Sequence, residues 1–173
     1  MQEIYVENLK EVLRSKFRLQ KELEIKLTNK GKNVFVNGPA NKEFIAIEVL
    51  EAINLGFSAD RALELTQNGF MLQTVHIKDI TKRHDLERVR ARIIGTQGRT
   101  LKTLQNLTNC DLAMNDNEIG LIGPIQEMED AVQAVTSLVQ GSKQGNVYGR
   151  LERQRKKKGL DDSELELDIE EKE

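Results

Sequence analysis

Apolar and polar residues alternate along the chain with two periods, one typical of strands and one typical of helices. Twice, a short strand-like run ends in Gly-Pro, and helical periodicity follows as far as a glycine eighteen positions beyond the first one. These repeated landmarks are Gly38-Pro39 with Gly56, and Gly123-Pro124 with Gly141. The repetition predicts two copies of one small α/β unit. Because each copy is near the lower size limit for independent stability, we expect the two to pack together.

The first copy, assigned to residues 1–57, is predicted to contain an opening strand, a helix, a β-hairpin and a second helix. These elements are expected at residues 4–6, at 8–21, at 23–27 with 34–37, and between Pro39 and Gly56. Ser58 is suited to cap a further helix that runs through Leu65. We expect that helix, within residues 58–71, to connect the two copies.

The second copy, assigned to residues 72–149, has a clearer pattern with the order strand, helix, helix, strand, strand, helix. The strands are expected at residues 72–77, 110–114 and 118–122, and the first two helices at 85–94 and 99–109. The turn Asn115-Asp116-Asn117 separates the last two strands. The chain is therefore predicted to be α+β, with two tandem units of the order β-α-α-β-β-α.

Charge is segregated along the chain, although the total is only −2. Residues 1–71 have a net charge of zero, residues 72–160 of +5, and residues 161–173 of −7. Lysine and arginine also solvate ordinary surfaces, but that explanation does not account for the segregation. A polyanionic partner for residues 72–160 is the simplest cause.

The loop Gly95-Thr96-Gln97-Gly98 lies between the two helices of the second copy. Its glycines let the backbone turn sharply and leave room for a phosphate to approach. The following helix directs its unpaired N-terminal amides at the same place, and Arg99 and Lys102 add positive charge. Helix, Gly-x-x-Gly, helix and then a hairpin is the arrangement of a type I KH domain, in which the loop clamps the backbone of about four single-stranded nucleotides.

The flanking residues of the loop extend the expected RNA-binding set. Arg92 and Ile94 precede the loop, and Ile94 is a candidate for the aliphatic floor on which bases lie, or is an ordinary core residue. Tyr148 is the sole aromatic residue between positions 72 and 160, so a stacking platform of exposed rings is excluded. An aliphatic groove fits this composition.

The first copy has no matching glycine loop. Its corresponding segment contains Arg14, Lys16 and Arg18, which either contact RNA or form a solvated helix face. Without the glycines and without net positive charge, we expect this degenerate copy to serve packing or protein binding.

The C-terminal segment, residues 150–173, changes character abruptly. A basic helical extension that includes Arg150 and Arg153 is expected to extend the RNA contact. The acidic run from Asp161 is predicted to be a disordered tail, either solubilising or folded back on the basic surface.

The sequence contains none of the constellations that indicate an enzyme. We identify no catalytic residues, no metal site and no cofactor motif, and Gly98-Arg99 lacks the Lys-Ser/Thr ending of a nucleotide-binding phosphate loop. Cys110 is the single cysteine, and we expect it to be a small buried hydrophobic residue. With no apolar stretch of spanning length and no signal-like opening, we expect a cytoplasmic protein without a membrane partner.

With the glycine loop, the Gly123-Pro124 junction, the run Val147-Tyr148-Gly149 and a divergent first copy, the chain resembles the partner of NOB one family of pre-ribosomal KH proteins. The resemblance implies binding of single-stranded RNA near the 3′ end of small-subunit ribosomal RNA, beside the maturation endonuclease in the pre-ribosomal particle. It carries over RNA contacts to residues 95–98, Arg99 and Lys102. Archaeal relatives commonly keep a glycine loop in the first copy, which this chain lacks.

Two other functions fit the same sequence. A general adaptor for RNA degradation or translation would bind many single strands broadly. A protein scaffold with a vestigial glycine loop would have no affinity for RNA. Oligomeric state and base preference stay open at this level.

Overall fold

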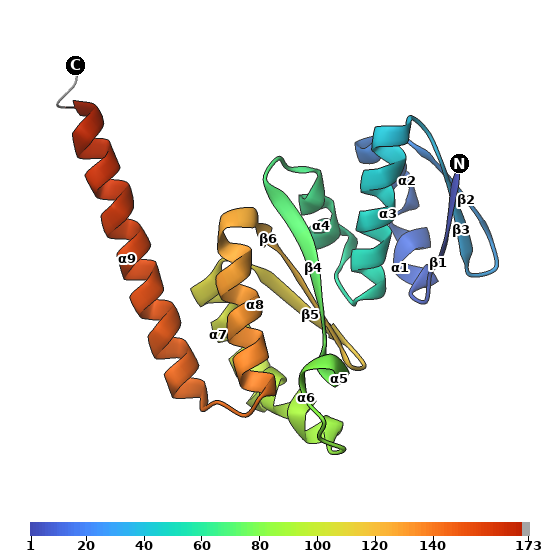
Figure 1. Cartoon of the computed structure of the whole chain (residues 1–173). Coiled ribbons are helices and arrows are strands. Elements are labelled where there is room, and N and C mark those ends of the chain that lie inside the picture. Colours follow the sequence, from blue (N-terminus) through green and yellow to red (C-terminus); the bar gives the residue numbers. More distant parts are fainter. Residues whose placement is uncertain (171–173) are drawn as a thin grey trace.

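Both copies of the repeat fold with the same order of elements, and each forms a three-stranded antiparallel sheet (Figure 1). The computed structural model describes the backbone of residues 1–170 and the side chains of residues 1–159. The predicted α+β class with two tandem β-α-α-β-β-α units is confirmed.

The first unit has two short helices where the sequence predicted a single one. Its elements are β1 (Gln2–Tyr5), α1 (Leu9–Arg14), α2 (Lys16–Leu23), β2 (Lys26–Lys30), β3 (Asn33–Asn37) and α3 (Ala40–Asn54). The strand order is β1-β3-β2. The helix breaks at Ser15, and the left-handed residue Glu24 ends α2. The predicted strand at 23–27 therefore starts three residues later, because Leu23 still belongs to the helix.

The second unit follows the prediction more closely. Its elements are β4 (Phe70–His76), α5 (Ile77–Ile80), α6 (Leu86–Ile94), the 3-10 turn η2 (Thr96–Gly98), α7 (Arg99–Thr108), β5 (Asp111–Asn115), β6 (Glu118–Pro124) and α8 (Ile125–Val139). The strand order β4-β6-β5 leaves β5 at one edge of the sheet. The single turn α5 was not foreseen from the sequence.

The two units are alike in local detail as well as in order. The proline of each Gly-Pro pair caps a helix of 15 residues, α3 or α8. A Cβ atom at Gly38 would lie 2.9 Å from Cγ2 of Ile25, and one at Gly123 would lie 2.6 Å from Sγ of Cys110. Ile25 and Cys110 each stand directly before the first strand of their hairpin. The same close contact therefore explains why a glycine recurs at this point of the repeat.

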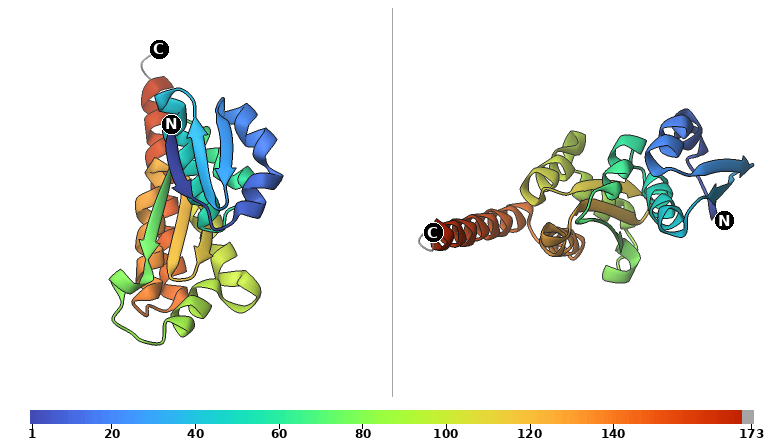
Figure 2. Two further views of the ribbon diagram at one scale, coloured as in Figure 1. Left: turned by 90° about the vertical axis from the view of Figure 1, so that its right-hand side faces the viewer. Right: turned by 90° about the horizontal axis from the view of Figure 1, so that it is seen from above.

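The sheet of the second unit is covered on both faces. Alternate residues such as Val75 and Leu121 pack against α6, α7 and α8. The opposite face, with Phe70 and Ile122, packs against the core of the first unit, which includes the short connecting helices α4 (Ala59–Ala62) and η1 (Leu63–Thr66). Figure 2 shows the resulting order of layers, with the first unit behind the second sheet and the long C-terminal helix on the far side.

Specific contacts hold the two units together. A Cβ at Gly120 of β6 would lie only 2.7 Å from Cε2 of Phe57, so the segment after α3 packs directly on the strand. Asn115 Nδ2 donates to the carbonyl of Asn54 at 2.9 Å. These contacts confirm that the two copies pack against each other, and they give the first unit a structural role at the back of the second sheet.

The C-terminal helix α9 (Gln144–Glu170) is longer than the sequence suggested. It begins six residues before Arg150, and its buried residues Val147 and Leu151 join the core of the second unit. The acidic run, predicted to be a disordered tail, is helical as far as Glu170. Leucine and glutamate are strong helix formers, and they continue the helix that the basic segment starts.

Candidate nucleic-acid interface

The glycine loop turns the chain between α6 and α7 through backbone angles that most residues avoid. Gly95 has φ 75° and ψ 175°, a region open almost to glycine alone, and Gly98 has φ 72° and ψ 14°. Gln97 between them also has a positive φ, 54°. The amide of Gly98 donates to the carbonyl of Gly95 at 3.2 Å, which closes the turn.

The two glycines of the loop have different surroundings. A Cβ at Gly95 would lie 2.2 Å from Oγ1 of Thr100, a buried residue in the first turn of α7. That hydroxyl is fixed in turn by Gln144 at the start of α9, whose Nε2 donates to it at 3.0 Å. A Cβ at Gly98 would meet no atom within 4 Å. Gly95 therefore serves packing, while Gly98 presents open backbone to the solvent.

The first turn of α7 meets the requirements of an anion site. Gly98 is its N-cap and no side chain of the described residues accepts from its first amides. Arg99 and Lys102 are exposed on the same turn, and Thr96 and Gln97 are exposed in the loop. Ile94, just before the loop, exposes 38% of its surface. The structure thus places groups suited to binding a phosphate next to one exposed aliphatic side chain.

Three arginines of the expected RNA-binding set lie elsewhere or have another partner. Arg92 Nη2 donates to the backbone carbonyls of Gly141, at 2.9 Å, and Ser142, and so ties α6 to the end of α8. Arg150 donates to Ser137 Oγ of α8 at 3.1 Å. Arg153 is exposed on α9. The geometry supports the loop, Ile94, Arg99 and Lys102 as RNA-contacting residues more strongly than these arginines, whose contact with RNA stays a prediction.

One hydrogen bond links α6 to the turn between β5 and β6. Arg90 Nη1 of α6 donates to Asn117 Oδ1, at the end of that turn, at 2.7 Å. This pair could not be predicted from the sequence, because the two residues are far apart in the chain. The excess of positive charge in residues 72–160 was the available signal for Arg90.

Ion pairing distinguishes the two halves of the molecule. In the first half, Arg14, Arg18 and Arg61 all contact carboxylates, so the basic segment of the first unit is largely neutralised. Among the described side chains from residue 78 onward, Lys158 is the cation that forms ion pairs, with Glu127 and Asp130. The exposed cations of α5 to α7 and the loop between them face solvent: Lys78, Lys82, Arg83, Arg88, Arg99 and Lys102.

The first unit lacks the geometry of the glycine loop. Only Ser15 separates α1 from α2, and its φ of −100° is an ordinary value. Only about 10 Å³ of empty space remains between α1 and β2. Mainly aliphatic side chains line it, including Leu13 and Leu27. This unit therefore lacks the sharp, glycine-containing turn of the second unit, and it has little empty space beside α1.

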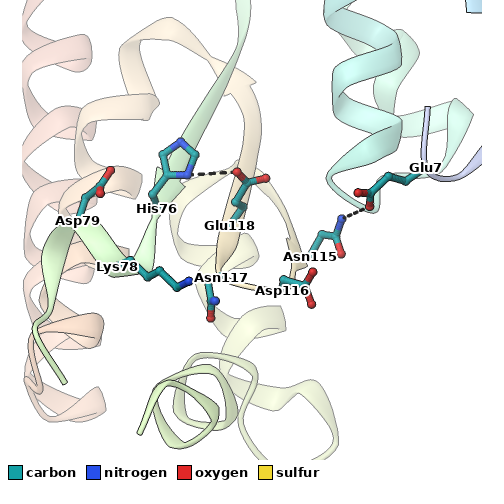
Figure 3. Close-up of a pocket in the computed structure, with 8 residues that line it drawn as sticks. All are labelled: Glu7, His76, Lys78, Asp79, Asn115, Asp116, Asn117 and Glu118. Atoms are coloured by element: carbon teal, nitrogen blue, oxygen red, sulfur yellow. Dashed lines mark hydrogen bonds and ion pairs between the residues drawn. The ribbon is translucent and has the colours of Figure 1, made fainter. Parts of the chain in front are cut away.

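A larger hollow of about 520 Å³ lies beside the β5–β6 turn, and Glu7 of the first unit contributes to its lining (Figure 3). Its lining includes four carboxylates, and one of them, Glu118, pairs with His76 at 3.2 Å. The residues that line it are Glu7, His76, Lys78, Asp79, Asn115, Asp116, Asn117 and Glu118. This excess of negative charge disfavours phosphate, so the larger hollow is a poorer RNA site than the glycine loop.

Cys110 is 1% exposed, and burial raises the pKa of its thiol to about 11.

The described residues contain no group of three or more His, Cys, Asp or Glu side chains placed to hold a metal ion. Among them there is also no helix with the length and hydropathy needed to cross a membrane.

Residues 71–156 match the model of the eukaryotic type (type I) KH domain found as the second KH domain of PNO1. A KH domain-containing protein of Methanocaldococcus jannaschii is 27% identical over 113 residues, which are 65% of this chain and 50% of that protein. The pre-rRNA-processing protein PNO1 of Eremothecium gossypii is 33% identical over 107 residues, 60% of this chain and 40% of that protein. The chain thus spans about half or less of the length of these curated relatives.

A solved structure shares nearly the whole fold. A chain in the crystal structure of the a/eIF2alpha–aDim2p–rRNA complex from Pyrococcus horikoshii superposes with a TM-score of 0.82 at 26% identity. The similarity covers 90% of this chain and 94% of that one. It extends well beyond the second unit, so both repeated units and their packing are shared.

Proposed function

The chain belongs to the PNO1/Dim2 family of KH-domain proteins, and on this basis we propose that it is a non-enzymatic, rRNA-binding factor of pre-rRNA processing. Its second unit grips single-stranded RNA, with the glycine loop on the sugar-phosphate backbone and the bases in the adjoining groove.

The observation that carries this proposal is the open backbone at Gly98, directly before an uncapped helix N-terminus. Backbone amides at such a position point at an approaching anion, and the absence of a side chain lets a phosphate come close. Exposed Arg99 and Lys102 supply charge at the same point. Together these features favour a nucleic-acid backbone over a neutral protein ligand.

The more specific part of the proposal concerns the RNA segment. We place the contact near the 3′ end of small-subunit rRNA, beside the endonuclease that matures this end within the pre-ribosomal particle. Support comes from the family resemblance and from the Pyrococcus complex, which contains rRNA. That complex also contains a/eIF2alpha, so a factor of this kind is a further proposed partner.

The first unit has a supporting role in this proposal. It covers the back of the second sheet, and it lacks a phosphate seat of its own. We therefore propose one principal RNA site for each chain, with the first unit available for packing or protein contact.

Sequencing of RNA that copurifies with the full chain tests the proposal. Enrichment of a segment at the 3′ end of small-subunit rRNA is expected. Broad recovery of unrelated single strands would favour the general adaptor, and a complete lack of bound RNA would favour the protein scaffold. Titration with a fluorescent 3′-end oligonucleotide and a scrambled control of equal length provides the affinity ratio.

A further inference from the structure

We propose that two copies of this chain associate through the outer edge of β4, so that their second sheets join into one continuous sheet across a twofold axis. The two β4 strands pair in the antiparallel sense, and Gln73 of each copy lies beside the axis. The inference goes beyond the proposed function, because it concerns the edge of the sheet opposite β5 and needs no RNA.

The outer edge of β4 carries backbone groups that no described strand pairs with, and the left view of Figure 2 shows β4 outermost in its sheet. In an antiparallel pair, alternate residues direct their N–H and C=O groups at the partner strand, and the residues between direct them away. The amide of Ile77 donates to the carbonyl of Asn117 at 2.8 Å, in register with the pairing of β4 and β6. The odd-numbered residues of β4 therefore bond to β6, and the backbone groups of Leu72 and Thr74 point outward.

The other three sheet edges are blunted, as the edges of natural proteins commonly are. β1 has four residues and includes the charged Glu3. In β2, the amide of Leu27 donates to the side chain of Gln20 at 2.8 Å, and β5 begins with the charged Asp111. β4 has seven residues, with no Lys, Arg, Asp or Glu among them. A long, uncharged and open edge is a template for pairing with another chain.

A groove of about 620 Å³ lies beside β4, on the side of the sheet that α8 covers. Met128 and Val132 supply its apolar part, and Glu129 is its single charged lining residue. The remaining lining residues are polar and uncharged: Gln73, Gln133, Thr136, Ser137 and Gln140. A twofold contact places such a surface against its own copy, where charges would repel each other. Amide and hydroxyl groups both donate and accept, so this neutral surface fits a second copy of itself.

Gln73 joins the strand edge to the groove. Its side chain lines the groove, on the same face of the sheet as those of Met71 and Val75. With Gln73 at the axis, Leu72 of each copy lies opposite Thr74 of the other, and these are the residues with outward backbone groups. The two Gln73 side chains then face each other, with about 4.5–5.5 Å between their Cβ atoms. One register therefore satisfies both the backbone bonds and the side-chain contact.

Analytical ultracentrifugation of the full chain, over a concentration series and without RNA, tests the proposal. One chain has a mass of 19.7 kDa, and the average mass should rise toward twice this value as the concentration increases. Gln73→Lys sets two like charges against each other at the axis and should weaken association by about fivefold or more. Gln2→Lys is the matched control, because it makes the same change at an exposed position of the β1 edge.

A charge-swap mixture identifies the self-contact. Gln73→Glu alone should also weaken association, but an equimolar mixture of Gln73→Lys and Gln73→Glu should associate more tightly than either variant, because opposite charges then meet at the axis. A purely structural role of Gln73 would not produce this recovery. Thr74→Pro removes an outward N–H group and should weaken association too, whereas Thr74→Val keeps that group and should not. Thermal melting verifies that each variant is folded.

An average mass that stays at 19.7 kDa at every concentration overturns the inference and leaves the β4 edge to a strand of another protein. Association that is unchanged in folded Gln73→Lys, or a charge-swap mixture without recovery, overturns it as well, because the contact then lies on another surface. Since no RNA is present in these experiments, either result leaves the proposed function intact.

Discussion

Replacement of Gly98 by aspartate should weaken RNA binding while the protein stays folded. The position has φ 72° and ψ 14°, and a Cβ there meets no atom within 4 Å. Strain is therefore limited to the left-handed conformation, which costs an ordinary residue about 1–2 kcal/mol, and aspartate adopts it more readily than most residues. Since domains are commonly stable by about 5–15 kcal/mol, the Gly98→Asp protein should remain folded.

The effect on RNA binding should equal or exceed the effect on folding. The new carboxylate would occupy the place of a phosphate at the start of α7. Two like charges about 4 Å apart repel by about 1 kcal/mol in water and about 4 kcal/mol at an effective dielectric constant near 20. The expected loss of affinity is therefore between about fivefold and about a thousandfold.

The assay is a fluorescence anisotropy titration of a single-stranded oligonucleotide, with Gly98→Asn as the matched control. Asparagine has the same shape and a similar tolerance for this backbone conformation, but no charge. The asparagine variant should lose far less affinity than the aspartate variant, and the gap should shrink at high salt because screening weakens the repulsion. Equal affinity for aspartate, asparagine and wild type would refute a phosphate seat at Gly98.

The remaining predictions concern the same groove and the core around it. Gly95→Ala should lower the melting temperature more than Gly98→Ala does. Backbone strain costs about 1–3 kcal/mol at either position, but only at Gly95 would the new Cβ also clash, at 2.2 Å from Thr100 Oγ1. Equal melting temperatures would contradict this. Contacts to three or four phosphates should give a log–log salt slope of roughly −2 to −3, whereas a slope near zero would favour a protein scaffold. Cys110 should resist alkylation in the native protein at neutral pH, because its thiol is buried and burial raises its pKa from 9.0 to about 11. The folded protein therefore favours the protonated thiol, and this contribution to stability should be lost as the pH rises through that range. The melting temperature of Cys110→Ala should accordingly fall less at alkaline pH than that of wild type. Gly120→Ala should destabilise the whole chain, because its Cβ would lie 2.7 Å from Phe57 where the two units meet, and a melt like that of wild type would argue against tight packing there.

The glycine loop could be located from sequence because its geometry requires that residue type. Gly95 and Gly98 both have positive φ, which is a local requirement that the sequence records directly. The repeated Gly-Pro pairs are visible for a related reason, since each glycine fits against the residue that precedes the first strand of the hairpin in its own unit. Features fixed by local backbone geometry were therefore predicted well.

Features that depend on distant partners were not predicted. Arg92 looks like an RNA contact beside the loop, yet its guanidinium binds carbonyls at the end of α8, 49 and 50 residues away. The bond between Arg90 and Asn117 joins residues 27 apart and has no sequence signature. The break at Ser15 was missed because the apolar periodicity of the first helix continues through it.

Mapping of the RNA contact on the full chain tests the proposed phosphate clamp most directly. The chain is bound to a 3′-end oligonucleotide of small-subunit rRNA, and the contact is read from NMR amide shifts or from crosslinking followed by mass spectrometry. The largest changes are expected at residues 95–98, Arg99 and Lys102, with further changes around Ile94. Nucleotides bound elsewhere, with residues 95–98 unperturbed at saturation, would contradict it.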